Sequence, residues 1–237
     1  MKTDKKPWYS GLSIFTGKIA RNHLLPWVAA LLLAAFLLSK PSYLSNGQPQ
    51  PAPPANPEIS LIFMGDIMQH MPQVESAWND SIGRYIYDSC FQYVRPLIES
   101  YDLAIANLET TLAGKPYSGY PAFSSPDDLV NGLITAGIDI LGTANNHCCD
   151  RGGNGVRRTS RMLDSLGIRH MGTYATETEW KERTPLIVEQ KGFKLAFLNY
   201  TYGTNGIPVP EGTVVNLIDK DKIREDLKKA KKTRLDL

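Results

Sequence analysis

The stretch "DILGTANNHCCDRGGNG", residues 139–155, joins an apolar run to a dense set of polar groups. Ile138, Ile140 and Leu141 have the character of a buried strand, and the chain then supplies two asparagines, a histidine, two cysteines and an aspartate before a cluster of glycines. Buried strands usually end in simple turn residues. This segment therefore predicts a strand that forms the floor of a functional site.

Apolar runs alternate with amphipathic stretches on both sides of this segment. Strands are predicted at residues 59–64, 103–106, 138–142 and 168–171, and helices at residues 90–101, 126–136 and 154–166. Ser125 and Pro126 mark the start of the second of these helices, and Gly137 marks its end. The alternation predicts an α/β fold in which helices cover the faces of a sheet.

Two further elements are expected near the C-terminus. Residues 186–189 and 193–201, joined across Lys191 and Gly192, predict a hairpin that is added to the same sheet. Residues 219–232 predict a strongly charged helix.

The first 57 residues carry the features of a membrane-targeting segment. Residues 24–38 (LLPWVAALLLAAFLL) are uncharged, and five lysines and arginines precede them. Since no small-x-small cleavage pattern follows, an uncleaved signal anchor is favoured over a cleaved signal peptide or a buried core helix. The predicted parts are a basic cytoplasmic N-terminus at 1–22, a transmembrane anchor at 23–39, a Pro-rich linker at 40–57 and a domain at 58–237.

The charge is divided in the same way. Residues 1–57 contain 6 Lys/Arg and 1 Asp/Glu, a net charge of +5, whereas residues 58–237 contain 20 and 23, a net charge of −3. The basic end is expected to stay in the cytoplasm, which predicts a single-pass protein of the cell membrane with its domain on the extracytoplasmic side. A slightly acidic domain argues against nucleic acid as a partner, because binding to a polyanion usually needs a basic surface.

The chain has three cysteines, which cannot form an even disulfide framework. Cys148 and Cys149 are adjacent and cannot easily pair with each other, although Cys90 could pair with one of them. Three unpaired and mostly buried thiols are expected, and the spacing gives no zinc signature.

Polar side chains follow each of the first three predicted strands. They are Asp66 and His70 after the first strand, Asn107 and Glu109 after the second, and Asn145, Asn146, His147 and Asp150 after the third. Because functional groups gather at the carboxyl ends of parallel strands, these side chains are expected to meet at one rim of the sheet. Taken one at a time, each could instead be a turn, cap or buried structural residue.

Carboxylate, amide and imidazole groups together suit a divalent cation such as manganese, iron(II), zinc or magnesium. The groups at this rim, Asn107 among them, therefore predict a site for a divalent metal.

Several stretches resemble the CapA family of capsule, or poly-γ-glutamate, synthesis proteins. They are "FMGDIMQH" (63–70), "DLAIANLETTLAG" (102–114), "GYPAFSSPDDLVNGLITAGIDILGTANNHCCDRGGNG" (119–155), "RTSRMLDSLGIRHMGTY" (158–174) and "NYTYGTNGIPVP" (199–210). That family resembles the calcineurin-type metallophosphoesterases. The resemblance implies an α/β sandwich with a two-metal site.

The resemblance also implies roles for particular residues. Asp66 would be the first ligand aspartate, Glu109 the carboxylate that completes the pair, and Asn146 the ligand asparagine. His147 would be the catalytic histidine that assists the leaving oxygen, with Asp150 as the partner that orients it.

The sequence departs from the phosphoesterase pattern in three places. Residues 66–68 read Asp-Ile-Met where Asp-x-His is typical, and the second block is Asn-x-Glu rather than Gly-Asp. The later His-Trp-Gly block of the family would fall beyond Leu237, so the domain is expected to be incomplete at its C-terminus. His170, at the end of the fourth strand, is expected to be structural rather than a ligand.

Three functions remain open at this point. The first is a membrane-anchored, metal-dependent hydrolase of the metallophosphoesterase type. The second is a non-catalytic scaffold that binds or guides poly-γ-glutamate or another anionic capsule polymer, for which the basic side chains after the site are Arg151, Arg157, Arg158 and Arg161. These arginines could equally form a solvated helix face. The third is an inactive, truncated remnant of the domain.

Overall fold

The computed structural model describes residues 15–20 and 56–233. Its strands are β1 Phe15–Ala20, β2 Glu58–Ile67, β3 Trp78–Asn79, β4 Arg84–Tyr85, β5 Leu103–Leu108, β6 Ile140–Gly142, β7 Arg169–Met171, β8 Thr173–Tyr174, β9 Leu186–Gln190, β10 Phe193–Phe197 and β11 Val214–Val215. Its helices are α1 Met71–Ala77, α2 Asp88–Phe91, α3 Arg95–Ile98, α4 Asp128–Thr135, α5 Gly152–Ser165, α6 Glu177–Arg183 and α7 Lys220–Lys232.

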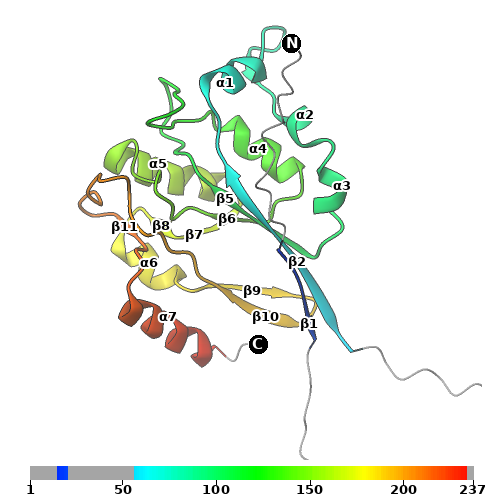
Figure 1. The fold of residues 1–237 in the computed structure, drawn as a ribbon, viewed down its shortest axis with the longest axis vertical. Helices are drawn as coiled ribbons and strands as arrows, with labels where there is room; N and C mark the ends of the chain where they lie inside the picture. The colour runs from blue at the N-terminus through cyan, green and yellow to red at the C-terminus, as the bar shows by residue number, and fades with distance from the viewer. Residues whose placement is uncertain (1–14, 21–55, 234–237) are drawn as a thin grey trace, which may run out of the picture.

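A five-stranded sheet with the order β1-β2-β5-β6-β7 forms the centre of the fold (Figure 1). Strands β2, β5, β6 and β7 are parallel, and helices connect them in sequence. This confirms the predicted α/β fold and its four strands. The parallel order brings the carboxyl ends of β2, β5 and β6 to one edge of the sheet, where the polar side chains were expected.

Strand β1 lies at the other side of β2 and is antiparallel to it, with Phe15 opposite Phe63 and Ala20 opposite Glu58. Its residues precede the predicted membrane segment. The predicted segment at 23–39 lies outside the described residues. Among the described residues, no helix has the length and apolar character needed to span a membrane.

Helices cover one face of the sheet. Alternation along β5 points Ala104 and Ala106 to this face, where they pack with Leu133 of α4 and Leu163 of α5. The small alanine side chains let the helices approach the sheet closely. Gly137 and Gly167 follow the ends of α4 and α5 with φ values of +94° and +71°, the left-handed conformation that terminates a helix.

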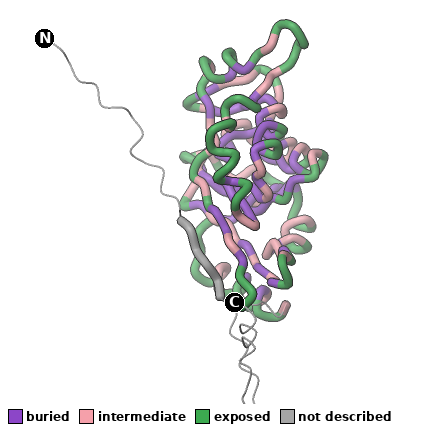
Figure 2. Tube along the Cα trace, turned by 90° about the vertical axis from the view of Figure 1, so that its right-hand side faces the viewer, coloured by how far each residue is buried: buried purple, intermediate pink, exposed green. Residues whose placement is uncertain are grey.

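The hairpin of β9 and β10 covers the opposite face. Leu103 and Ile105 of β5 pack there against Val188 of β9 and Leu195 of β10. The buried segments in Figure 2 accordingly run through the middle of the molecule. The result is a sandwich in which helices, sheet and hairpin form three layers.

The hairpin itself forms as predicted, but its expected place in the central sheet is wrong. Strands β9 and β10 make a separate two-stranded sheet. Lys191 and Gly192 both have positive φ values, +50° and +79°, which is the requirement of a tight two-residue turn. The faces of the central sheet are apolar and need cover. Leu195 and its neighbours are therefore buried by packing on a face of the sheet, without joining it as further strands.

The single helix predicted at residues 90–101 is also wrong, because two short helices, α2 and α3, occupy this region. Pro96 lies in the first turn of α3. A proline has no N–H to donate and its ring clashes with the carbonyl four residues earlier, so the helix cannot run through it. The first turn of a new helix tolerates the same residue.

Candidate functional site

Asp66 and Asn107 meet where β2 and β5 end. The register of these strands shifts between Met64 and Asp66, so that one residue, Gly65, bulges out of the ladder. The shift brings Asp66 opposite Asn107, and the Asn107 Nδ2 donates a hydrogen bond of 2.7 Å to the Asp66 Oδ1. Glu109 follows two residues later, and its backbone N–H is held by the Ile67 carbonyl at 2.9 Å.

The carboxyl groups of Asp66 and Glu109 lie within hydrogen-bonding reach of each other. Glu109 is only 8% exposed. Burial, the Asp66 carboxylate and the more distant charge of Asp150 together raise the pKa of Glu109 to about 7. The pair therefore resists carrying two negative charges unless a proton or a cation lies between its members.

Asn145 joins the strand ends to the loop after β6. Its Nδ2 donates to the Asn107 Oδ1 at 3.1 Å and to the Leu108 carbonyl at 2.8 Å, and its Oδ1 accepts from the His147 backbone N–H at 3.0 Å. The Asn107 oxygen thereby accepts one hydrogen bond and keeps a second lone pair, while its Nδ2 donates to Asp66. In this arrangement the Asn107 amide group holds the Asp66 carboxylate, and the role of its oxygen as a metal ligand stays a prediction.

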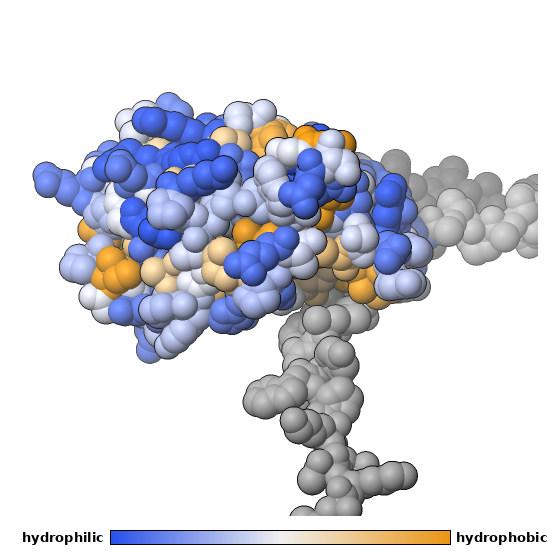
Figure 3. All heavy atoms as spheres, turned by 90° about the horizontal axis from the view of Figure 1, so that it is seen from above, coloured by the Kyte–Doolittle hydropathy of each residue, from blue (hydrophilic) through white to orange (hydrophobic). Residues whose placement is uncertain are grey.

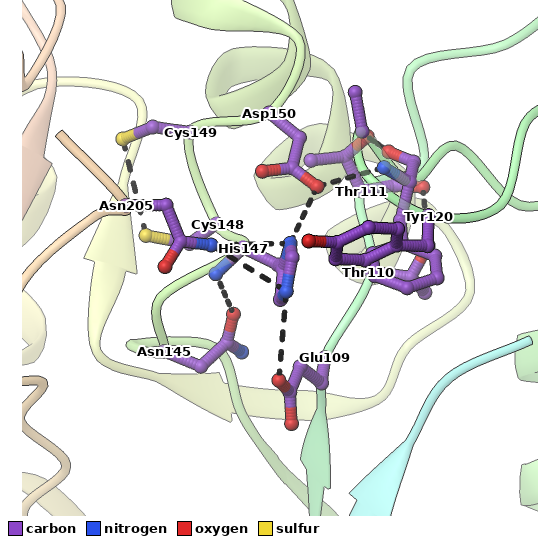
Figure 4. A network of polar contacts seen from close by, with 12 residues as sticks. Glu109, Thr110, Thr111, Tyr120, Asn145, His147, Cys148, Cys149, Asp150 and Asn205 are labelled. Carbon is purple, nitrogen blue, oxygen red and sulfur yellow. Dashed lines mark hydrogen bonds and ion pairs between the residues drawn. The ribbon is translucent and has the colours of Figure 1, made fainter. Parts of the chain in front are cut away.

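His147 lies between two carboxyl groups (Figure 4). Its Nδ1 is 2.8 Å from the Asp150 Oδ2, and its Nε2 is 4.0 Å from the Glu109 Oε1. Since the Asp150 carboxylate is the acceptor, Nδ1 carries the proton in the neutral ring and the Nε2 lone pair faces Glu109. Phe123 also donates its backbone N–H to the Asp150 Oδ2 at 2.7 Å, which fixes that carboxylate.

The remaining predicted residues lie at the periphery of this cluster. His70 is exposed and is the N-cap residue that precedes α1. Its ring lies 5.7 Å from the ring of Phe123, and the Phe123 ring lies 4.6 Å from that of His147. Asn146 is half-buried, and its side chain makes no hydrogen bond within the described part of the chain. The structure thus brings together Asp66, Asn107, Glu109, His147 and Asp150, and leaves His70 and Asn146 outside their hydrogen-bond network.

The other residues of interest are accounted for. His170 is buried and its Nε2 lies 3.1 Å from the Asp164 Oδ1. All three cysteines are free, as predicted, although Cys90 is exposed rather than buried. The sulfurs of Cys148 and Cys149 lie 3.9 Å apart.

The donor set meets the requirements of a divalent cation only in part. Within residues 15–20 and 56–233, no three histidine, cysteine, aspartate or glutamate side chains are grouped so as to hold a metal. The neighbouring carboxylates of Asp66 and Glu109 are oxygen donors of the type that manganese or magnesium prefers, and the side chain of Asn146, in the loop after β6, carries a further oxygen of this type. Burial, and then the neighbouring Asp66 carboxylate, raise the pKa of Glu109, and a bound cation would offset both effects.

Comparison with known proteins shows which family the chain belongs to. Residues 60–237 match the family described as "Bacterial capsule synthesis protein PGA_cap". The capsule biosynthesis protein CapA of Bacillus anthracis is 23% identical over 186 residues, which cover 75% of this chain and 42% of CapA. The uncharacterized protein y4sH of Sinorhizobium fredii is 36% identical over 91 residues, which cover 35% of this chain and 20% of that protein. The chain therefore spans less than half the length of these relatives.

Proposed function

Because this chain belongs to the PGA_cap family of bacterial capsule synthesis proteins, we propose that it serves capsule polymer synthesis or export as a metal-dependent hydrolase of the metallophosphoesterase type. The substrate would be a phosphoester or a bond in a capsule polymer such as poly-γ-glutamate. Attachment to the membrane through residues 23–39, with the domain on the extracytoplasmic side, is part of the proposal.

One observation carries the proposal: the imidazole of His147 lies between the Asp150 carboxylate and the Asp66–Glu109 carboxyl pair. Asp150 keeps the proton on Nδ1, so that Nε2 can exchange a proton with a group bound above Glu109. A residue that is only structural would not need its free nitrogen to face a carboxyl group with a pKa of about 7.

Asp66 and Glu109 would hold a divalent cation, and Asn146 would complete the donor set. When bound, such a cation polarises a phosphoryl oxygen and lowers the pKa of a coordinated water. The role of Asn107 and Asn145 is to fix the carboxylates and the loop of His147 relative to each other. A site held in this way keeps its geometry without reorganising during the reaction.

The experiment combines cation binding with turnover on the full chain. Calorimetric titration with Mn²⁺ and hydrolysis of p-nitrophenyl phosphate would be measured for the parent, Asp66→Ala, His147→Ala and the control Glu75→Gln, an exposed residue of α1. We expect Asp66→Ala to lose cation affinity by about tenfold or more. His147→Ala should keep the affinity and lose turnover, and Glu75→Gln should match the parent. The absence of Mn²⁺ binding, with turnover unchanged in both site variants, would refute the proposal.

The second candidate function, a non-catalytic scaffold for an anionic polymer, is favoured by a different observation. Arg151 and Arg157 line an open hollow of about 560 Å³ between the start of α5 and residues 210–212. Arg158 does not contribute, because both of its terminal nitrogens pair with Asp127 at 2.7 and 2.8 Å. Polymer yield that survives Asp66→Ala but falls in an Arg151→Gln, Arg157→Gln double variant would favour this function over hydrolysis.

A further inference from the structure

The stretch "NYTYGTNGIPVP", residues 199–210, contributes nothing to the hydrolase described so far, yet it contacts the site at two points. The first is Asn199, which lies just after β10. Its Oδ1 accepts the Ala144 backbone N–H at 2.6 Å and its Nδ2 donates to the Ala144 carbonyl at 3.3 Å. Asn199 therefore pairs with the backbone immediately before Asn145 and supports the loop from below.

The second contact is made by Asn205. Its backbone has a φ of +52°, at the tip of a turn in which the Ile207 N–H bonds the Thr204 carbonyl at 2.9 Å. Asparagine tolerates this left-handed conformation better than most residues. The Asn205 Nδ2 lies 3.4 Å from both Nδ1 and Nε2 of His147, beside the ring in Figure 4.

Equal distances to the two ring nitrogens exclude a hydrogen bond directed at one lone pair. They place the amide against the imidazole ring as a whole. The Phe123 ring meets the same imidazole almost perpendicularly, at 83° and 4.6 Å between centroids. Asp150 holds only Nδ1, and a single hydrogen bond leaves the ring free to tilt about it. The two neighbouring contacts remove that freedom.

We propose that Asn205 is a positioning residue, which keeps the imidazole of His147 in the plane where Nε2 faces Glu109 and covers it from solvent. The exposures agree with a cover: Asn205 is itself exposed, whereas His147 beneath it is 6% exposed. The mechanistic meaning of this role rests on the proposed hydrolase, but the contact can be tested without any turnover.

The variants are chosen to keep the turn intact. Asn205→Gly suits a positive φ and removes the amide, and Asn205→Asp suits the same backbone and keeps the size of the side chain. Tyr202→Ala, in the same loop and 77% exposed, is the matched control. All are made in the full chain.

The first readout is the rate at which diethyl pyrocarbonate modifies His147, followed by mass spectrometry, with the exposed His70 as an internal reference. We expect a several-fold faster reaction at His147 in Asn205→Gly, the parent rate in Tyr202→Ala, and an unchanged rate at His70 in all. In Asn205→Asp the cover remains and the new carboxylate favours the charged, unreactive ring, so the rate at His147 should not exceed that of the parent. The second readout is the chemical shifts of the His147 ring protons at a fixed pH, which the nearby Phe123 ring makes sensitive to orientation. These chemical shifts should differ from those of the parent in Asn205→Gly and match those of the parent in Tyr202→Ala.

An unchanged modification rate and unchanged ring shifts in Asn205→Gly would overturn the inference, as would an equal effect of Tyr202→Ala. On p-nitrophenyl phosphate, Asn205→Gly should lower kcat by about tenfold with little effect on KM, since the misplaced group acts in the chemical step. If no protein in the series turns over the substrate, the proposed hydrolase fails, while the modification rates still decide the role of Asn205.

Discussion

Asp150 is almost completely buried, and a single oxygen of its carboxylate accepts hydrogen bonds from His147 and from the backbone of Phe123. The sequence predicted the contact between Asp150 and His147, and the structure contains it. The catalytic role of this pair stays a prediction. The second donor, Phe123, could not be predicted, because it lies 27 residues from Asp150 and offers only its backbone.

The roles of the adjacent residues Asn145 and Asn146 also could not be predicted from the sequence. Sequence patterns placed both Asn145 and Asn146 at the end of a strand, and the resemblance selected Asn146 as the ligand. It is Asn145 that joins Asn107 to the loop of His147. Neighbouring residues in a turn point in different directions, so their roles depend on backbone angles that composition does not reveal. Asn205 was missed because it follows the hairpin rather than a strand of the parallel sheet.

His170 leads to a prediction about pH. Burial lowers the pKa of its imidazole, although the neighbouring Asp164 carboxylate acts in the opposite direction. Protonation is therefore harder in the folded state than in the unfolded state, whose pKa is about 6.5. The stability that the neutral ring contributes is fully present above this value, and it is lost as the pH falls below it toward the folded pKa.

We expect the free energy of unfolding, measured by urea denaturation, to fall less between pH 7.5 and pH 5.5 in His170→Gln than in the parent. Glutamine does not titrate and can still donate a hydrogen bond to Asp164. The comparison uses the change between the two pH values, so any cost of the substitution itself at pH 7.5 cancels. Parallel stability profiles for the two proteins would contradict the assignment.

At the scale of the secondary structure elements, the junction of β7 and β8 supports the site through one glycine. Gly172 has a φ of +111°, and a Cβ there would lie 2.1 Å from the Asn199 Oδ1 and 2.5 Å from the Ala144 nitrogen. These are the two partners of the hydrogen bond beneath the loop that carries His147. Gly172→Ala should therefore destabilise the protein by about 3 kcal/mol or more in urea denaturation.

Gly167→Ala is the matched control. Gly167 also has a positive φ, +71°, but no atom lies within 4 Å of the position of its Cβ. Only backbone strain is then expected, about 1 kcal/mol. Similar losses in the two variants would show that crowding at Asn199 and Ala144 is unimportant.

The elements that the sequence predicted well have strong local signals. Strands β2, β5 and β6 each contain a short, mainly apolar run, and glycines in the left-handed conformation follow α4 and α5. The two wrong predictions, the single helix at residues 90–101 and the place of the hairpin, depended on features that the local apolar pattern does not contain. The apolar spacing of residues 90–101 favoured one helix, and Pro96 divided it. The hairpin pattern was correct, whereas its partner in space depended on which face of the sheet lacked cover.

At the scale of the whole molecule, the described residues form a sandwich with helices on one face of the central sheet and a hairpin on the other. The surface seen from above is mainly hydrophilic, with small, separate apolar areas (Figure 3). The class of fold could be predicted from the alternation of elements. The antiparallel β1 could not, since its residues lie in a basic segment assigned to the cytoplasmic side of a membrane anchor.

The pairing of β1 with β2 requires these two strands to lie side by side, whereas the proposed anchor places them on opposite sides of the membrane. The ladder places Ala20 opposite Glu58, a pairing in which the Cα distance suits a disulfide. A signal anchor at 23–39 instead separates these residues by the thickness of the bilayer. We expect Ala20→Cys, Glu58→Cys to cross-link under mild oxidation in lipid-free protein and not in membranes from expressing cells, with Ala20→Cys alone as the control.

Peptide mapping by mass spectrometry would identify the bond and distinguish it from one with Cys90. A bond between positions 20 and 58 in the membrane fraction would contradict the anchored topology. Its absence from the lipid-free protein would contradict the ladder.

The same strand pairing makes the order of events during biosynthesis important. A chain in which β1 has already paired with β2 can no longer pass through a translocation channel, because the folded domain is too wide for the channel. For the proposed anchor, insertion into the membrane has to be faster than folding. Slow closure of the β1–β2 edge would then favour insertion, and changes that speed up that closure would leave folded molecules that are not inserted.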